Sequence, residues 1–470
     1  MDLSRRQLIA SGGLIGGAGL AAALWTGRFR TASPDDDPPG PSHDLDVPAP
    51  SEFATVVDAV SVGADPTGRE PINRILEQYV DDDTLIIIPA GTYRLLPIEL
   101  TGYRRFGLAA EPGAHPTFVG DPAHCVPGGE SYLRFHEVGG LLFDGIDIDF
   151  TAPGAGGTVR INAVGDVVLG DVDITGSCDE QITQLRLDVL DPDATALVER
   201  LTLDMPDDET DLTAIFVGEP HAGTAVFRDC TVSGFTDNGL YGSPPGLPTG
   251  AGGTVRVERG VYRNNNIANI RLGTEGSVAD GVESVSDAPP PVSGGSPANA
   301  RGIRLRNGQR QLIENCRIQL TSTSRFAHAG ITVHETNGGA TVRNTEVEVD
   351  RDDTPAVRLF PDQNTHAAIP EFDGVTVTGS AAGGQAIFID DRDETVFRNC
   401  TLRQSGANRN GIFLRDSADC RLVNCHIEVT NRPLVLQNST LLIQNSTLIN
   451  PQSTETISEL LATEESLPRW

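Results

Sequence analysis

The stretch Phe-Arg-Asn-Cys-Thr-Leu at residues 397–402 returns at residues 422–427 as Leu-Val-Asn-Cys-His-Ile, with Gly-Ile-Phe-Leu at 411–414 between the two copies. The same pair of motifs occurs upstream, as Glu-Asn-Cys-Arg-Ile at 314–318 and Gly-Ile-Thr-Val at 330–333. Each motif alternates apolar and polar residues, which indicates a short, half-buried strand, and its initial Asn or Gly suits a tight bend. Because the motifs recur, each unit buries its apolar face against its neighbours, and the sequence predicts a solenoid of stacked β-coils.

Two series of apolar positions follow this repeat, at steps of mostly about 25–31 residues. The first series comprises Ile146, Val172, Leu201, Cys230, Val261, Val282, Cys316, Thr345, Val375, Cys400, Cys425 and Ser446, of which the coil at Val282 is the least clearly defined. The second series comprises Leu240, Ile270, Ile303, Ile331, Val357, Ile387, Ile412 and Leu434. No helix-length periodicity lies between them, and the Leu-x-x-Leu-x-Leu signature of leucine-rich repeats is absent, so the pattern favours an all-β solenoid.

The N-terminal part of the repeat region has an order of its own. Gly-Ala-Asp at 63–65 precedes apolar residues at helical spacing between 72 and 79, and Leu-Ile-Ile-Ile-Pro-Ala-Gly-Thr-Tyr at 85–93 predicts a buried strand and turn. This order resembles the N-terminal cap of right-handed parallel β-helix proteins, the group that includes the pectate lyases. The resemblance covers about residues 57–450. It implies an all-β, right-handed parallel β-helix whose N-terminal capping helix covers the open apolar end.

The chain divides into three regions. Arg-Arg at 5–6, followed by an apolar run, makes residues 1–30 resemble a twin-arginine export signal that is cleaved or stays as an anchor; the alternative is an ordinary cytosolic N-terminus. Residues 31–52 are rich in Pro, Asp and Ser and predict a disordered linker. Residues 53–465 form the predicted β-helix domain, closed by a short helical cap at 455–465. We therefore expect an extracellular or cell-surface protein that meets a membrane only through an uncleaved N-terminal segment.

The net charge of the chain also fits an extracellular protein. The formal net charge is −30, from 65 acidic and 35 basic residues, and no residue is lysine. Such acidity suits a protein that works in concentrated salt, which screens the self-repulsion between acidic side chains, so we expect a halophilic, haloarchaeal source. Nucleic-acid binding is disfavoured because no basic face offsets the acid.

Four of the seven cysteines share the inward position of the first series: Cys230, Cys316, Cys400 and Cys425. They are expected to pack as small apolar residues in the core. A disulfide between Cys400 and Cys425 is the alternative, since strands of neighbouring coils lie about 4.8 Å apart. No Cys-x-x-Cys pair supports a zinc site.

Outward residues next to the second series should form a ladder on the solvent face, since alternate side chains of a strand point outward. These residues are Tyr241, Arg271, Arg304, Thr332, Arg358, Phe388 and Phe413. Further arginines and histidines lie in the same segment: Arg301, Arg306, His328 and His334. Arginine binds carboxylates bidentately, so we predict an acidic-polysaccharide site formed by Arg271, Arg301, Arg358 and Tyr241. The alternative is that each arginine pairs with a surface Asp or Glu.

Candidate catalytic groups adjoin this ladder. Asp237 and His334 are the candidate acid and base, although Asp237-Asn238-Gly239 is equally a turn motif. Pectate lyases use an arginine base and clustered Asp ligands for Ca²⁺, and the resemblance implies Arg304 or Arg271 as such a base. The motifs of polygalacturonase-like hydrolases are absent. Two long loops, 242–253 and about 284–300, and an irregular stretch at 177–195 could shape a groove.

A separate acidic position occurs near the N-terminus. Asp147 and Asp173 are predicted neighbours on successive coils, and Asp149 and Asp204 share the adjacent row. Stacked carboxylates can hold Ca²⁺ or act as the acid and base of a glycoside hydrolase. A plain halophilic surface is the alternative. No other cofactor is expected.

The functional prediction is an exported lyase or glycoside hydrolase acting on an acidic glycan. The alternative is a non-catalytic cell-surface protein that binds glycan or the cell envelope.

Overall fold

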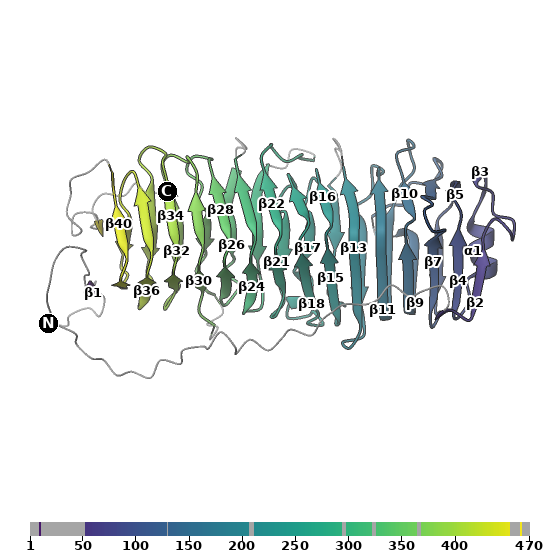
Figure 1. Ribbon diagram of the computed structural model, residues 1–470, viewed down its shortest axis with the longest axis horizontal. Helices are drawn as coiled ribbons and strands as arrows, with labels where there is room; N and C mark the ends of the chain where they lie inside the picture. The colour runs from purple at the N-terminus through teal and green to yellow at the C-terminus, as the bar shows by residue number, and fades with distance from the viewer. Residues whose placement is uncertain are drawn as a thin grey trace.

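Each coil of the chain contributes strands to three parallel sheets, which together form a right-handed parallel β-helix in the computed structural model (Figure 1). The structure describes residues 9–10, 52–128, 130–205, 211–293, 298–321, 326–363, 368–451 and 461–462. In this part of the chain, every strand pairing is parallel. The prediction of an all-β solenoid is confirmed.

Sheet A contains the following strands: β1 (Ile9–Ala10), β2 (Thr55–Asp58), β4 (Thr84–Ile88), β7 (Phe106–Ala110), β9 (Ser131–Asp144), β11 (Thr158–Thr175), β13 (Thr195–Asp204), β15 (Thr224–Arg228), β18 (Thr254–Glu258), β21 (Val278–Asp280), β24 (Gln311–Glu314), β27 (Ala340–Arg343), β30 (Glu371–Asp373), β33 (Val396–Arg398), β36 (Cys420–Val423) and β39 (Leu441–Gln444).

Sheet B contains the ends of β11 and β13 together with these strands: β3 (Thr67–Pro71), β5 (Thr92–Leu95), β8 (Thr117–Gly120), β10 (Asp147–Asp149), β16 (Thr231–Ser233), β19 (Val261–Arg263), β22 (Glu283–Ser286), β25 (Arg317–Leu320), β28 (Glu346–Val349), β31 (Thr376–Thr378), β34 (Thr401–Gln404), β37 (His426–Val429) and β40 (Thr447–Ile449).

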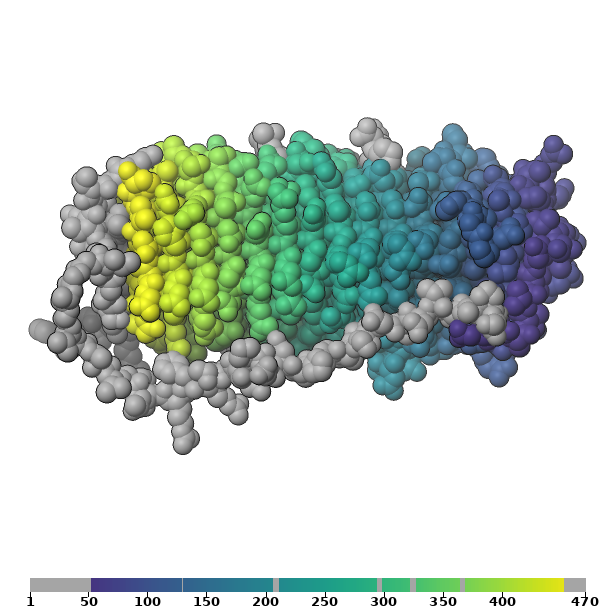
Figure 2. Space-filling model, viewed as in Figure 1, coloured from purple at the N-terminus to yellow at the C-terminus, as the bar shows by residue number. Residues whose placement is uncertain are grey.

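Sheet C contains the beginnings of β9 and β11 together with these strands: β6 (Ile98–Thr101), β12 (Thr183–Val189), β14 (Thr213–Phe216), β17 (Leu240–Gly242), β20 (Ile270–Leu272), β23 (Asn299–Leu305), β26 (Phe326–Val333), β29 (Val357–Leu359), β32 (Gln385–Asp390), β35 (Asn410–Arg415), β38 (Leu434–Gln437) and β41 (Leu461–Ala462). Because coils stack in chain order, each occupies its own band along the rod (Figure 2).

The predicted helix is present as α1 (Asn73–Tyr79), at the same end of the solenoid as β2 and β3 (Figure 1). Its apolar residues recur at helical spacing, and Ile75 and Leu76 are buried in the main core. A short 3₁₀ helix, η2 (Pro244–Gly246), lies in the predicted loop 242–253. No helix in the described ranges has the length and apolar character needed to cross a bilayer.

The second apolar series is confirmed residue by residue in sheet C, from Leu240, which pairs with Ile270, to Ile412, which pairs with Leu434. The inward residues of these strands are buried. The outward ladder predicted from Tyr241 to Phe413 therefore has the expected register.

The first series follows the corner between sheets A and B, and it is correct except at one coil. The pairing of Thr231 with Val261 places Gly260, not Val261, level with Cys230. The bend residue in this coil is Arg259, with φ 60°, and not the Asn or Gly that begins the motif elsewhere. Gly260 also has a positive φ, and a Cβ there would lie 2.4 Å from the Cys230 carbonyl oxygen, so only glycine fits.

The corner residue has a left-handed backbone in coil after coil. Asn315, Asn344, Asn399, Asn424 and Asn445 all have positive φ, a conformation that asparagine tolerates better than most residues. The Nδ2 group of Asn424 donates to Oδ1 of Asn399 at 3.4 Å, so part of this row also bonds along the solenoid. The initial Asn of the repeat is explained by this bend.

Two regional predictions need correction or lie outside the structure. The stretch 177–195, expected to be irregular, contains β12, because Leu185, Leu187 and Val189 alternate inward and pair with β11 and β14. The C-terminal helical cap predicted at 455–465 falls mostly outside the described residues, and Leu461–Ala462 within it is strand β41. The predicted export signal and linker lie outside the described residues except for Ile9–Ala10 and residue 52.

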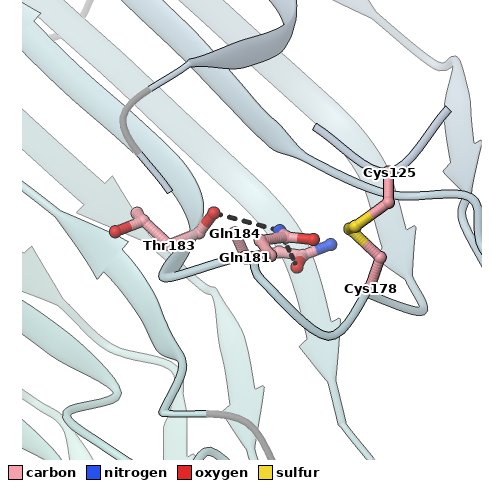
Figure 3. Close-up of a disulfide and its surroundings, with 5 residues drawn as sticks. All are labelled: Cys125, Cys178, Gln181, Thr183 and Gln184. Atoms are coloured by element: carbon pink, nitrogen blue, oxygen red, sulfur yellow. Dashed lines mark hydrogen bonds between the residues drawn. A yellow bond between two sulfur atoms is a disulfide. The ribbon is translucent and has the colours of Figure 1, made fainter. Parts of the chain in front are cut away.

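A disulfide bond that the sequence did not predict joins Cys125 and Cys178 (Figure 3). These cysteines lie in loops between strands and not on the repeat. Beside the bond, Gln181 donates through Nε2 to Gln184 Oε1 at 2.8 Å and to the Thr183 carbonyl at 3.0 Å. The other five cysteines are free, including Cys400 and Cys425, as the core-packing prediction expected.

Candidate functional site

Five arginines gather on the outer face of sheet C. Arg271 in β20 pairs directly with Arg304 in β23, and Arg358 in β29 occupies the same outward row two coils further on. Arg301 lies earlier in β23, and Arg306 follows that strand. We call these residues the arginine cluster. Parallel pairing places equivalent residues of successive coils about 4.8 Å apart, so the cluster spans only a few coils.

The arginine cluster has no acidic partners in the part of the chain that the structure describes. No Asp or Glu oxygen there lies within 4.0 Å of a guanidinium nitrogen of the cluster, although ion pairs are frequent elsewhere on the surface. The Nε atoms of four members are also buried without a hydrogen-bond partner: Arg271, Arg301, Arg304 and Arg306. Among the described residues, the alternative that each arginine pairs with a surface carboxylate therefore does not hold.

Crowding of like charges affects the protonation of these groups. Burial, followed by the positive charges of Arg301, Arg271 and Arg306, lowers the pKa of Arg304 to about 9. Burial and neighbouring arginines likewise lower the pKa of Arg301 to about 10. Buried cations without counter-ions are costly, and an anionic ligand would remove that cost.

Aromatic rings lie against the arginine cluster. The Arg271 guanidinium carbon is 3.9 Å from the centroid of Tyr241, and that of Arg358 is 4.3 Å from Phe360 and 5.5 Å from Phe388. Such contacts attract a cation to the ring face and hold the flexible side chain in place. The predicted binding residues Tyr241, Arg271 and Arg358 are therefore held in position by rings before any ligand arrives.

Two histidines face the arginine cluster. The ring centroids of His328 and His334 lie 6.4 and 6.2 Å from that of Phe360. Burial first, and then the charges of Arg306, Arg304, and others, lower the pKa of His334 to about 3, and burial lowers that of His328 to about 4. Both rings are therefore neutral near pH 7.

The hydrogen bonds of His334 define its tautomer. The backbone N–H of Thr336 donates to His334 Nδ1 at 3.3 Å, so Nδ1 carries a lone pair and the proton resides on Nε2. As a candidate acid or base, His334 can offer a neutral N–H to a ligand, and it does not act as an imidazolium at neutral pH.

Asp237, the other candidate acid or base, precedes β17 at the edge of the arginine cluster. Its Oδ2 accepts a hydrogen bond from the Thr213 hydroxyl at 2.6 Å, and its Oδ1 accepts one from Asn238 Nδ2 at 2.8 Å. Burial raises the pKa of Asp237 above the ordinary value, while these bonds and the charge of Arg271 oppose that rise. A carboxyl with a raised pKa suits the role of general acid.

A positioning arginine was not found from the sequence. Arg392 follows β32 and is almost fully buried. Its guanidinium donates to the carbonyl oxygens of Phe360 at 2.6 Å, Asn337 at 2.5 Å and His334 at 3.0 Å. It thus joins the two loops that carry His334 and Phe360. Sequence alone offers no signal for this, because the acceptors are main-chain atoms.

The predicted acidic position lies elsewhere, on sheet B. Asp147 and Asp173 are neighbours as expected, and the Asp173 backbone N–H donates to Asp147 Oδ1 at 3.1 Å. Burial raises the pKa of Asp147. Within the described ranges, no three His, Cys, Asp or Glu side chains are placed to share a metal ion. Ca²⁺ binding at this pair stays a prediction, with two carboxylates where calcium usually takes six to eight oxygen ligands.

Comparisons with known proteins agree with this architecture. Residues 356–456 match the family model described as "Right handed beta helix region". No curated protein sequence matches the chain. Similar solved structures include the Agl-KA catalytic domain (12% identity, TM-score 0.46, 84% of this chain and 65% of that one) and the A-module of the mannuronan C-5 epimerase AlgE4 from Azotobacter vinelandii (12%, 0.41, 85% and 100%).

PfbA, a surface adhesin of Streptococcus pneumoniae, is similar at the same level (11% identity, TM-score 0.43, 84% of this chain and 92% of that one). The chain spans 61% of the Geobacillus virus E2 protein ORF18, another similar structure, and 65% of the Agl-KA domain. With TM-scores below 0.5, these similarities carry no argument about this chain, and its function depends on the residues of the site.

Proposed function

We propose that this protein binds an acidic polysaccharide on the outer face of sheet C and cleaves it by β-elimination. One observation carries the proposal: five neighbouring guanidinium groups have no carboxylate within 4.0 Å among the described residues, in a chain with 65 acidic residues. Such cations need a counter-charge from a ligand, and a uronate carboxylate matches the arginine fork in shape and sign.

The residue chemistry supports a lyase better than a hydrolase. Glycoside hydrolases typically use two carboxyl groups across the scissile bond. Asp237 interacts with Arg271 at one end of the cluster, and Asp390, which interacts with Arg358 at the other end, is already ion-paired with Arg415. In β-elimination, a base takes the C5 proton of a uronate, the bond from C4 to the glycosidic oxygen breaks, and the departing oxygen takes a proton. Arg304 is the candidate base because its pKa is lowered to about 9, and Asp237 is the candidate acid.

The remaining arginines have binding roles in this proposal. Arg271, Arg301 and Arg358 neutralise substrate carboxylates, which makes the C5 proton easier to remove. Tyr241 holds Arg271, and the neutral His334 offers Nε2–H to a sugar oxygen.

Non-catalytic glycan binding is the second candidate. It is favoured by Asp237, since both of its carboxylate oxygens already accept hydrogen bonds from Thr213 and Asn238 and are less free to transfer a proton.

An exported, cell-surface location in concentrated salt completes the proposal. It is supported by the twin arginines at residues 5–6, the net charge of −30 and the Cys125–Cys178 disulfide, a bond that persists in oxidising compartments.

The test incubates the purified protein with a panel of uronate polymers while ultraviolet absorbance reports unsaturated products and calorimetry reports binding. We expect binding that R304Q weakens by about tenfold or more, with unsaturated product from at least one polymer. Binding without product would favour the second candidate. No binding to any uronate polymer would refute both.

A further inference from the structure

The outward row of sheet C continues past the arginine cluster toward the N-terminus. Tyr241 pairs with Phe216 of β14, and Phe216 pairs with Arg186 of β12. Arg186 in turn pairs with Arg160 of β11, which pairs with Arg134 of β9. Three successive coils therefore carry arginine at the position that Arg271 and Arg304 hold further along.

This row is unusual for so acidic a chain. Its ten positions hold six arginines and no Asp or Glu: Arg134, Arg160, Arg186, Phe216, Tyr241, Arg271, Arg304, Thr332, Arg358 and Phe388. The next position toward the N-terminus is acidic, because Glu99 of β6 pairs with Arg134. The positive stretch thus begins at Arg134.

Arg160 is the unpaired cation of the N-terminal group. Arg134 lies 3.3 Å from Glu99, and Arg186 lies 2.8 Å from Asp188, so these two arginines have acidic partners. Arg160 has no carboxylate within 4.0 Å among the described residues, and its Nε is buried without a hydrogen-bond partner. Burial and the positive charges of Arg186 and Arg134 lower its pKa. It therefore shares the main features of the arginine cluster.

Two aromatic residues connect the groups. The rings of Phe216 and Tyr241 meet edge to face, with their centroids 5.3 Å apart. The guanidinium carbon of Arg186 lies 5.2 Å from the Phe216 centroid, and that of Arg271 lies 3.9 Å from the Tyr241 centroid. Aromatic rings offer apolar surface to the C–H face of a sugar ring. No acidic residue of the row separates Arg160 from Arg271.

We propose that Arg160 is the centre of a second anion subsite, and that one linear polyuronate chain lies parallel to the solenoid axis across both the subsite and the arginine cluster. This inference rests on the proposed acidic-glycan function. Five coil steps separate Arg160 from Arg304, which corresponds to about 24 Å at about 4.8 Å per step. Only a chain at least that long contacts both, so the protein selects polymers over short oligomers.

The experiment compares digalacturonate, which is too short to span the two groups, with polygalacturonate, using calorimetry on the wild type, R160Q, R160K and the control R259Q. Arg259 is an exposed arginine at the corner of sheets A and B, paired with Asp229 at 2.7 Å. We expect R160Q to weaken polygalacturonate binding by about tenfold or more. The variant should leave unchanged the affinity for digalacturonate, which binds most tightly at the arginine cluster. R160K should retain most of the polymer affinity, and R259Q should alter neither ligand.

Circular dichroism establishes that each variant is folded. The subsite is refuted if R160Q leaves polygalacturonate affinity unchanged, or if it weakens both ligands equally. A wild-type protein that binds neither ligand refutes the proposed function itself, and an R304Q variant that loses digalacturonate while R160Q has no effect refutes the second subsite alone.

Discussion

Replacing Arg304 with glutamine should stabilise the folded protein while weakening its binding of acidic glycan. In the folded state, Arg304 lies among four other arginines and its buried Nε has no hydrogen-bond partner. In the unfolded chain, water solvates the same guanidinium fully. The charge is therefore destabilising unless a ligand anion is present, as is common for binding sites that hold strained charges ready.

The lowered pKa of Arg304 gives the magnitude. At 1.36 kcal/mol per pH unit, the lowering of the Arg304 pKa from the ordinary arginine value to about 9 corresponds to about 5 kcal/mol for a group entirely out of water. Arg304 is partly exposed, so solvent screening reduces this figure to about 1–3 kcal/mol, the cost of a buried polar group without a partner. R304Q should raise the free energy of unfolding by that amount.

The difference in the Arg304 pKa between the folded and unfolded states makes the free energy of unfolding depend on pH. Between pH 9 and the higher pKa that arginine has in the unfolded chain, the unfolded state binds more protons at Arg304 than the folded state does, so the free energy of unfolding should rise with pH across that window. Below pH 9 Arg304 is protonated in both states, so its charge destabilises the folded state by the full amount. The R304Q variant should lack this contribution.

The assay is urea unfolding followed by circular dichroism, with R259Q as the matched control. Arg259 donates through Nε and a terminal nitrogen to Asp229, both at 2.7 Å, so its removal should cost about 0–1 kcal/mol. Molar salt shortens the Debye length to about 3 Å. It should therefore reduce the change in unfolding free energy caused by R259Q, which removes the exposed Arg259–Asp229 pair, more than the change caused by R304Q. If R304Q destabilises the protein as much as R259Q or more, the guanidinium makes stabilising contacts and the reasoning is wrong.

Four further outcomes test the site and the fold. R358Q should weaken polyuronate binding about tenfold or more in calorimetry, because it removes a charge-assisted contact; unchanged affinity would exclude it from the site. D237N should remove the acidic limb of the pH–rate profile, which the raised pKa of Asp237 places above the usual range for aspartate, and a limb that persists would assign it to another group. H334Q should leave that profile unchanged between pH 5 and 8, because the pKa of His334 is about 3, and a new or lost inflection there would contradict the structure. Replacing Cys125 and Cys178 with serine should cost about 4 kcal/mol of unfolding free energy for a separation of 53 residues, and unreduced, denatured protein should label with five thiols by mass spectrometry, not seven.

Much of the fold could be predicted from the sequence alone, because short sequence motifs determine each repeat. Alternation of apolar and polar residues specifies which side of each short strand faces the core, and a one-residue slip would expose that face. The Asn at many of the C-terminal corners, such as Asn315 and Asn399, marks a left-handed bend that few residues tolerate. These two signals were sufficient to align Tyr241, Arg271, Arg304 and Arg358 on one outward row.

The same patterns failed where a coil departs from the repeat. Arg259 takes a bend usually made by Asn, Asp or Gly, which shifted the expected register to Val261. β12 was also missed, and Arg186 and the extension of the row were missed with it.

By itself, the sequence determined the solenoid, its register through most coils and the ladder of arginines on one sheet, since each depends on spacing along the chain. Only the tertiary structure decided that Arg304 and its neighbours have no acidic partners among the described residues, that Arg392 donates to backbone carbonyls of the loops carrying His334 and Phe360, and that Cys125 bonds to Cys178. The physical reason is distance: ion pairs and disulfides form over a few ångströms between groups far apart in the chain, and the paths of loops between coils set those distances without leaving a periodic signal.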